Sequence, residues 1–274
     1  MSKQMAGQGS RDVNMDKPRG DAAAATGDGR CGDGDARPDV VVLFTCIGRR
    51  VSLLRSFQRA ACELGLRAFF CGAETTRLSP ALQLCDASLL VEPTTSVRYI
   101  DQLLWIVRRH AVNLLVPTID LDLRLLAEHK PKFKEAGCRV LVSDPDVIDT
   151  CQDKRRTFGF LKKNGLGSPA TMSVRTALAA DLRGELKWPC FLKPWDGYAS
   201  LGATVVQDRR ELRFFARKVP NPICQEFVEG TEYTCDVYID FDRRVRCVVP
   251  RRRIEVRAGE GGGDHITYRR AGGE

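Results

Sequence analysis

The chain is poor in aromatic residues, in histidine and in long apolar runs. Only 7% of its residues are aromatic, whereas a nucleic-acid surface interleaves basic side chains with exposed rings. The three histidines, His110, His129 and His265, are not grouped with cysteines at zinc-ligand spacing. No apolar run approaches the ~20 residues that cross a bilayer. The sequence therefore predicts no zinc site, no nucleic-acid partner and no membrane partner.

Residues 1–38 contain no Leu, Ile, Phe, Tyr or Trp. Such a segment cannot bury enough apolar surface to offset its ordering entropy, so it is predicted to be a disordered tail. Its acidic residues and its lack of an apolar stretch are unlike a secretory signal or a transit peptide. We therefore expect a cytoplasmic protein.

The sequence also has no C-x-x-C pair, although it contains eleven cysteines. Single cysteines inside apolar segments are typical of buried reduced thiols rather than disulfides. This prediction covers Cys46, Cys62, Cys71, Cys138, Cys190, Cys224 and Cys247.

The net charge is +8, and its densest cluster is Arg251-Arg252-Arg253. One interpretation is a solvated strand end with excess arginine. The alternatives are an anionic substrate or a nucleic acid, recognised by the cluster.

Residues 39–148 alternate short strands with helices, which is typical of an open parallel sheet covered on both faces. The expected elements are strands 39–45, 67–71, 87–91, 112–116 and 139–142 and helices 51–61, 97–109 and 121–136. Ligands bind such sheets beyond the carboxyl ends of the strands, where Thr45 to Arg50 and Pro117 to Asp120 are rich in polar groups. Arg49 or Arg50 could clamp an anion and Asp120 could orient an amine. The alternative is a helix start and an N-cap.

No glycine triad follows the first strand, which disfavours a nicotinamide-dinucleotide site. After Asp144-Pro145 the pattern becomes that of an antiparallel α+β domain, residues 149–274. It is expected to contain helices 153–163 and 209–218 and strands 189–194, 203–206, 223–228, 233–240 and 244–253.

The segment from Pro189 to Gly202 carries the strongest functional signal. An apolar strand delivers Lys193 into a loop that contains Gly197, Ser200 and Gly202. The glycines let the backbone approach an anion closely, Ser200 adds a hydroxyl and Lys193 adds a charge. Because the Walker spacing is absent and a strand follows, we expect a flap over phosphates rather than a P-loop.

A second segment, Cys224 to Val237, places carboxylates on both sides of Gly230 and is typical of a hinge. Here the chain resembles the ATP-grasp superfamily, and specifically stand-alone relatives of the carbamoyl-phosphate synthase large subunit. The resemblance covers residues 39 to about 260. It implies an α/β fold with a pre-ATP-grasp domain followed by an ATP-grasp domain that is incomplete at its C-terminus.

The resemblance also implies roles for particular residues. Lys154, just before a helix, and Lys193 would contact the phosphates of ATP, together with the glycine loop. The backbone of Glu226, Phe227 and Val228 would hold adenine, and Glu232 would bind the ribose hydroxyls. Arg257, in the segment Arg257-Ala258-Gly259-Glu260, would be the catalytic residue and would stabilise the transferred phosphate. The polar strand ends Thr45 to Arg50 and Pro117 to Asp120 would help to bind the acceptor substrate. Each residue also has a structural alternative: a solvated helix lysine for Lys154, a strand lysine with its head in solvent for Lys193 and an edge-strand charge for Glu232.

The family's magnesium ligands, commonly a Glu-x-Asn on a downstream strand, are not found in this sequence, although Mg²⁺ is expected for the family. After Glu260 the sequence loses strand character. We therefore expect either a fragment of a longer chain or a degenerate relative.

The first hypothesis is an ATP-dependent carboxylate-amine ligase that acts through an acyl phosphate on an unknown small carboxylate or amine. The second is a catalytically inactive nucleotide-binding remnant or regulatory module that lacks the metal-binding lobe. Under either hypothesis, a homo-oligomer or a partner chain could cover the incomplete domain. The third is an anion or nucleic-acid binder that uses the arginine cluster.

Overall fold

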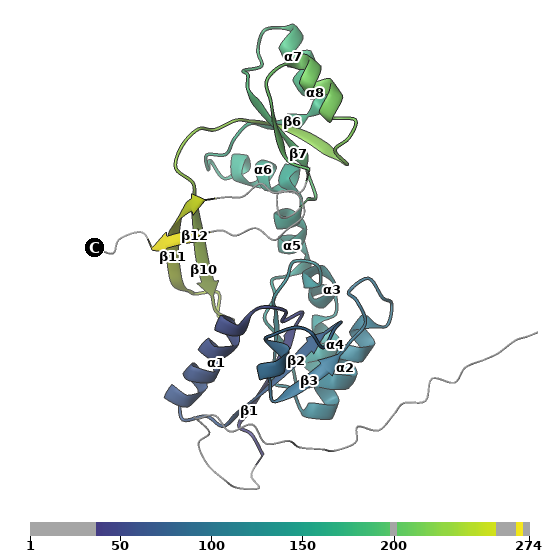
Figure 1. The fold of residues 1–274 in the computed structure, drawn as a ribbon, viewed down its shortest axis with the longest axis vertical. Helices are drawn as coiled ribbons and strands as arrows, with labels where there is room; N and C mark the ends of the chain where they lie inside the picture. The colour runs from purple at the N-terminus through teal and green to yellow at the C-terminus, as the bar shows by residue number, and fades with distance from the viewer. Residues whose placement is uncertain (1–36, 198–201, 256–266, 271–274) are drawn as a thin grey trace, which may run out of the picture.

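The computed structural model describes residues 37–197, 202–255 and 267–270, with the backbone alone for 253–255 and 267–270. The predicted disordered tail lies outside the described residues except for its last two. Three sheets organise the chain from Asp39 onward (Figure 1).

The first sheet is parallel and has five strands in the order β3-β2-β1-β4-β5. The chain builds outward on one side of β1 and then crosses to the other side, so the switch in direction lies between β1 and β4. The strands are β1 (Val40–Thr45), β2 (Ala68–Glu74), β3 (Ala87–Leu90), β4 (Leu114–Pro117) and β5 (Arg139–Val140). The elements between them are α1 (Val51–Glu63), the 3₁₀ turn η1 (Leu82–Leu84), α2 (Tyr99–His110), α3 (Leu123–Glu128) and α4 (Lys130–Glu135).

Alternate residues of β1 enter two different hydrophobic cores. Val41 and Leu43 pack in the core that includes the buried face of α2, while Val42 and Phe44 pack in the core that includes Leu54 of α1. A strand that is buried on both faces has a near-continuous apolar sequence. The sequence of Val40–Thr45 is of this kind, with five apolar residues followed by Thr45. The predicted parallel sheet with helices on both faces is confirmed.

Two helices in series lead from this sheet into the second one, namely α5 (Pro145–Gln152) and α6 (Lys154–Lys163). The second sheet is antiparallel, in the order β6-β9-β7-β8. Its strands are β6 (Thr171–Ser173), β7 (Cys190–Pro194), β8 (Thr204–Val206) and β9 (Pro222–Glu226), and its helices are α7 (Val174–Leu182) and α8 (Arg209–Phe215). Cys190 and Leu192 pack with both helices in a third core.

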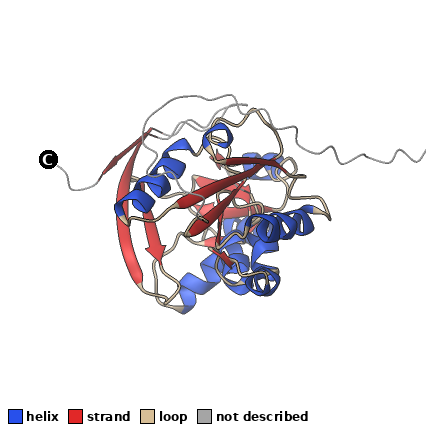
Figure 2. Ribbon diagram, turned by 90° about the horizontal axis from the view of Figure 1, so that it is seen from below, coloured by secondary structure: helices blue, strands red, loops and turns tan. Residues whose placement is uncertain are grey.

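The third sheet, also antiparallel, consists of β10 (Tyr233–Ile239), β11 (Val245–Glu255) and β12 (Thr267–Arg270). It forms a ribbon to one side of the other elements in both views (Figures 1 and 2). Arg139 of β5 lies 4.3 Å above the ring of Phe241, in the turn between β10 and β11.

Several sequence predictions are wrong in detail. The helix expected over 121–136 is two short helices that break at His129, because Pro131 in the first turn of α4 cannot continue α3. The elements α5, β6 and α7 were not predicted. Residues 267–270 form a strand, although this part of the sequence was expected to have lost strand character. Cys62 and Cys247 are exposed rather than buried, since one lies on the outer face of α1 and the other on the third sheet.

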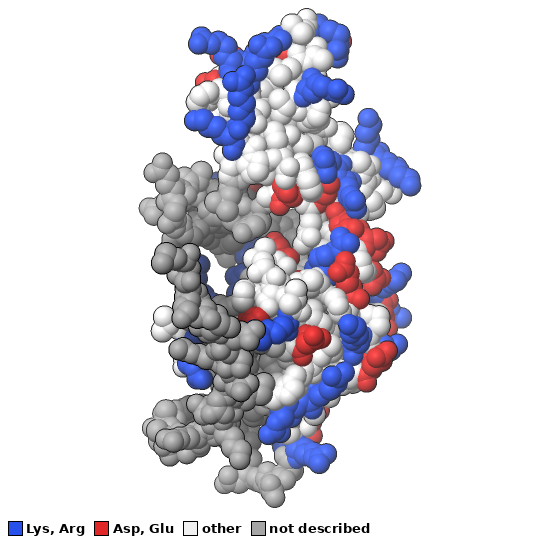
Figure 3. All heavy atoms as spheres, turned by 90° about the vertical axis from the view of Figure 1, so that its right-hand side faces the viewer, with Lys and Arg blue, Asp and Glu red and all other residues white. Residues whose placement is uncertain are grey.

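The cysteines of the described residues are free thiols, as predicted. In the described part of the chain, no helix has both the length and the apolarity to cross a bilayer. On one face of the molecule, Lys and Arg gather over the end that carries α7 and α8, and Asp and Glu gather near mid-height (Figure 3). The basic excess is therefore unevenly spread on this face and is interrupted by acidic groups.

Candidate functional site

Lys193 lies on the face of β7 that points away from the third core. Cys190, Leu192 and Pro194 are buried on one side of the strand, which leaves Phe191 and Lys193 on the other. The Lys193 ammonium donates a hydrogen bond of 2.6 Å to Oε1 of Gln225 on β9 and lies 5.3 Å from the centre of the Phe191 ring. This outer face therefore presents a positive charge supported by a neutral amide.

Lys154 is the first residue of α6 and reaches the start of the glycine loop. Its ammonium donates to the carbonyl oxygen of Gly197 at 2.5 Å and to that of Trp195 at 3.5 Å, and its backbone N–H donates to Trp195 O at 3.0 Å. The two predicted phosphate lysines, far apart in sequence, are thus brought to one region.

The two ammonium groups share an environment that disfavours their charge. Burial lowers the pKa of Lys193, and the nearby charge of Lys154 lowers it further. Burial also lowers the pKa of Lys154, against the opposing influence of Asp196 and Asp153. Because the hydrogen-bond acceptors of both side chains are neutral oxygens, an anion placed between them would stabilise the charged form of each.

The glycine loop joins β7 to β8, so the predicted order of strand, loop and strand is confirmed. Gly202 has φ +71°, a conformation that side chains rarely adopt, and a Cβ at Gly197 would come within 3.0 Å of the Pro194 ring. Ser200 lies outside the described residues. The backbone conformation therefore favours glycine at 202, and the close approach of the Pro194 ring leaves little room for a side chain at 197.

The predicted adenine and ribose segment follows β9. Glu226 is paired with Cys190 in the sheet, and its carboxylate accepts from Ala170 N–H at 3.1 Å. Phe227 is half-buried, and Val228 and Glu232 are exposed. This stretch connects the second sheet to the third, as expected of a hinge. Arg257, the predicted catalytic residue, lies outside the described residues.

A cavity of about 420 Å³ lies at the carboxyl ends of the parallel strands. Both of the predicted polar strand ends line this cavity: Cys46 to Arg50 come from the segment Thr45 to Arg50, and Ile119 comes from the segment Pro117 to Asp120. The remaining lining residues are Glu74, Thr75, Pro93, Thr94 and Leu121. Arg50 is tethered by a 3.3 Å hydrogen bond to Thr118 O, and α1 begins directly after it, as the helix-start alternative predicted. Asp120 is exposed and does not line the cavity.

Beside this cavity the structure reveals a buried carboxylate that sequence analysis missed. Asp122 accepts hydrogen bonds on one oxygen from Thr45 (2.7 Å) and from Tyr99 (2.9 Å), while its other oxygen has no partner. Burial raises its pKa. The only sequence signal was a second aspartate two residues after Asp120, at the same strand end.

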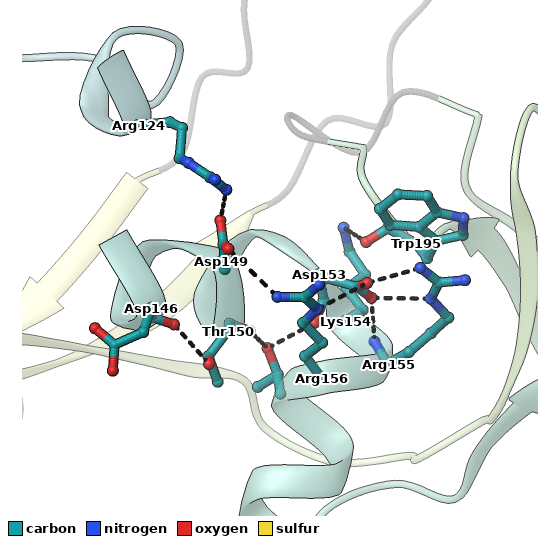
Figure 4. A network of polar contacts seen from close by, with 10 residues as sticks. Arg124, Asp146, Asp149, Thr150, Asp153, Lys154, Arg155, Arg156 and Trp195 are labelled. Carbon is teal, nitrogen blue, oxygen red and sulfur yellow. Dashed lines mark hydrogen bonds and ion pairs between the residues drawn. The ribbon is translucent and has the colours of Figure 1, made fainter. Parts of the chain in front are cut away.

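A polar network connects the parallel-sheet region to Lys154 (Figure 4). Arg124 of α3 forms an ion pair with Asp149 of α5, and Arg156 of α6 is 3.4 Å from the same carboxylate. The side chain of Gln152 also donates to Asp120 O at 3.0 Å. The segment between Ile119 and Leu121, two residues that line the cavity, is therefore linked to the α5–α6 junction next to Lys154.

Among the described residues, no group of three or more His, Cys, Asp or Glu side chains could hold a metal ion. The described residues thus offer no magnesium ligands from which a step could be argued, and we derive no step through the metal.

The fold and the site define a class of protein: a doubly wound parallel sheet joined to an antiparallel sheet that bears a glycine loop and two converging lysines. Residues 42–141 match the PylC-like N-terminal domain, and residues 151–274 match the ATP-grasp domain. The chain therefore contains an ATP-grasp domain, preceded by a PylC-like N-terminal domain.

Solved structures of ATP-grasp enzymes share the fold. An N5-carboxyaminoimidazole ribonucleotide synthetase in complex with ADP is 18% identical with a TM-score of 0.59, over 81% of this chain and 56% of that one. The biotin carboxylase domain of 2-oxoglutarate carboxylase from Hydrogenobacter thermophilus, in complex with MgADP, ADP and bicarbonate, is 15% identical with a TM-score of 0.59, over 77% and 49%. Biotin carboxylase from Campylobacter jejuni is 16% identical with a TM-score of 0.58, over 79% and 52%.

The chain thus spans about half the length of these structures. No curated protein matches it in sequence. The narrower resemblance to the carbamoyl-phosphate synthase large subunit stays a prediction.

Proposed function

We propose that the protein binds ATP and acts as an ATP-dependent carboxylate-amine ligase. The observation that carries this proposal is the pair of half-buried lysines, Lys154 and Lys193. Lys154 donates to Gly197 O at the start of the glycine loop, Lys193 donates to the amide of Gln225, and the charge of Lys154 is near enough to lower the pKa of Lys193. A polyphosphate supplies further negative charge beside both ammonium groups, and glycine-loop N–H groups can bind its oxygens.

The remaining predicted residues complete the nucleotide site in this proposal. Gly197, Ser200 and Gly202 approach the phosphates, the backbone of Glu226 to Val228 borders adenine, and Glu232 binds the ribose diol. Arg257 stabilises the charge of the transferred phosphoryl group. Each of these roles can be tested by substitution.

In the reaction, a carboxylate oxygen attacks the γ-phosphorus, the bond to ADP breaks, and an acyl phosphate forms. An amine then attacks the acyl carbon, which expels phosphate while the nitrogen loses a proton. Lys154 and Lys193 hold the phosphates and orient them for the attack. The cavity beside Gly48 and Glu74 holds the small acceptor, since it lies at the edge of the sheet where such folds bind ligands. The reaction takes place in the cytoplasm, with a second copy or a partner chain as a candidate binding partner.

The second candidate function is an inactive nucleotide-binding module. It is favoured by the absence of a metal-ligand cluster among the described residues. The two candidates share ATP binding and differ in turnover.

Calorimetric titration of the 274-residue protein with ATP, with and without magnesium, tests the shared claim. ADP release in the presence of pooled amino acids and small carboxylates then separates the candidates. Binding with acceptor-dependent ADP release supports the ligase, and binding without release supports the module. A protein that binds no ATP in either buffer refutes both.

A further inference from the structure

The start of the glycine loop is fastened to α6 by a contact that none of the proposed roles uses. The guanidinium carbon of Arg155 lies 3.9 Å from the centre of the Trp195 ring, and Trp195 stands two residues after Lys193. The labelled side chains in Figure 4 show Arg155 extending from α6 toward the indole. The contact therefore joins the two elements that carry the phosphate lysines.

Arg155 is held in its orientation by Asp153. The Nε and Nη2 atoms donate to the two carboxylate oxygens of Asp153 at 3.0 and 2.7 Å, and one of those oxygens also accepts the backbone N–H of Arg155 as the cap of α6. Asp153 is only 7% exposed, and this arginine lowers its pKa. A two-point grip on a planar guanidinium fixes the plane that faces the indole.

Trp195 is also fixed from its other side. Its backbone N–H donates to Asn221 O at 3.0 Å, and its carbonyl oxygen accepts from the backbone N–H of Lys154 at 3.0 Å. Asn221 in turn donates to the carboxylate of Asp196 at 2.9 Å. The segment Trp195 to Gly197 is thus tied to α6 and to β9, and the Lys154 ammonium ends on Gly197 O.

We propose that Arg155 is a positioning residue for polyphosphate binding, acting through Trp195. The stacked pair fixes Trp195 to Gly197 relative to the Lys154 ammonium, and so holds that ammonium where it meets the phosphates. This inference rests on the proposed ATP binding. Because Trp195 stands at the start of the glycine loop, its indole fluorescence is expected to change when a nucleotide binds.

Four single variants and one double variant test the pair by ATP calorimetry. Arg155→Met and Trp195→Leu each remove the stack and should weaken ATP binding about three- to tenfold, as expected for one cation–π contact. Trp195→Phe keeps an aromatic face and should bind within about twofold of the parent. Lys163→Met is the control, because it removes a positive charge from the exposed far end of the same helix, and it should leave affinity unchanged. Arg155→Met with Trp195→Leu should be no weaker than either single variant, since both remove one interaction.

Two further readouts separate positioning from general support of the fold. Adenosine, which lacks phosphates, should bind the parent and Arg155→Met equally, and ATP should change the tryptophan emission of the parent but not that of Trp195→Phe. Three results would overturn the proposal. The losses of ATP affinity in Arg155→Met and Trp195→Leu could add in full in the double variant, Arg155→Met could lose affinity for adenosine as much as for ATP, or Arg155→Met could bind ATP like the parent. If Lys193→Met loses ATP while Arg155→Met does not, only this inference fails. If the parent binds no ATP, the proposed function fails as well.

Discussion

Replacing Lys193 with methionine is the most direct test of the nucleotide site. The substitution keeps the apolar stem beside Phe191 and removes the ammonium. A charge-assisted hydrogen bond contributes about 1.5 to 3 kcal/mol, so ATP should bind roughly ten- to a hundredfold more weakly. Titration calorimetry at neutral pH measures the dissociation constant directly.

The same variant should fold as stably as the parent. Two effects on the free energy of unfolding oppose each other: Gln225 Oε1 loses the donor at 2.6 Å, while the fold is relieved of an ammonium whose charge burial and Lys154 disfavour. Thermal unfolding should therefore shift by only a few degrees, on the order of 1 kcal/mol or less. A loss of ATP affinity without unfolding assigns the effect to the lost charge.

Lys187→Met is the matched control. Lys187 is exposed and precedes the same strand, so the variant loses the same net charge away from the glycine loop and should bind ATP like the parent. If Lys193→Met also binds like the parent, the lysine only supports the sheet, and the reasoning from its unpaired charge is wrong.

Three other predictions follow from individual groups. Because the pKa of Lys193 is lowered, ATP affinity should begin to fall at a pH below the ordinary lysine value of 10.5, and Lys193→Arg, which stays protonated, should extend binding to higher pH in the same titration. The raised pKa of Asp122 means that the folded state binds more protons than the unfolded state above pH 3.8, so stability should decline as the pH rises from there through the folded pKa; Asp122→Asn should flatten that decline in thermal unfolding curves. Leu43→Ala empties a fully buried position of β1 and should lower the free energy of unfolding by about 2 to 5 kcal/mol in urea, whereas Leu78→Ala, at a position 89% exposed, should change it by less than about 0.5 kcal/mol.

The sequence predicted the parallel sheet well because its strands are buried on both faces. Val40–Thr45 is a continuous apolar run, and the helices around it repeat with helical spacing. Short elements with mixed burial were harder to predict. The three residues of β6 are too few to show a period, and α7 has a weak apolar face, with only Ala177 and Ala180 buried.

The site was predicted in part for a related reason. Lys193 and the glycines form a local pattern along the chain, so sequence alone could find them. Asp122, Tyr99 and Thr45 come together only through the fold, across separations of 23 and 77 residues. The stack of Arg155 on Trp195 likewise depends on where α6 meets β7, and no spacing in the sequence encodes it.

The treatment of charge elsewhere in the chain strengthens the case for an anionic ligand. Arg67 pairs with Asp39, Lys130 with Asp144, and Arg209 with Asp181, each across at most 3.4 Å. Lys193, in contrast, carries its charge into a half-buried position beside a second cation and donates to an amide. Such a charge lowers the stability of the folded state unless another group compensates it. A bound polyphosphate compensates both lysines at once, which accounts for their placement without requiring that they stabilise the empty fold.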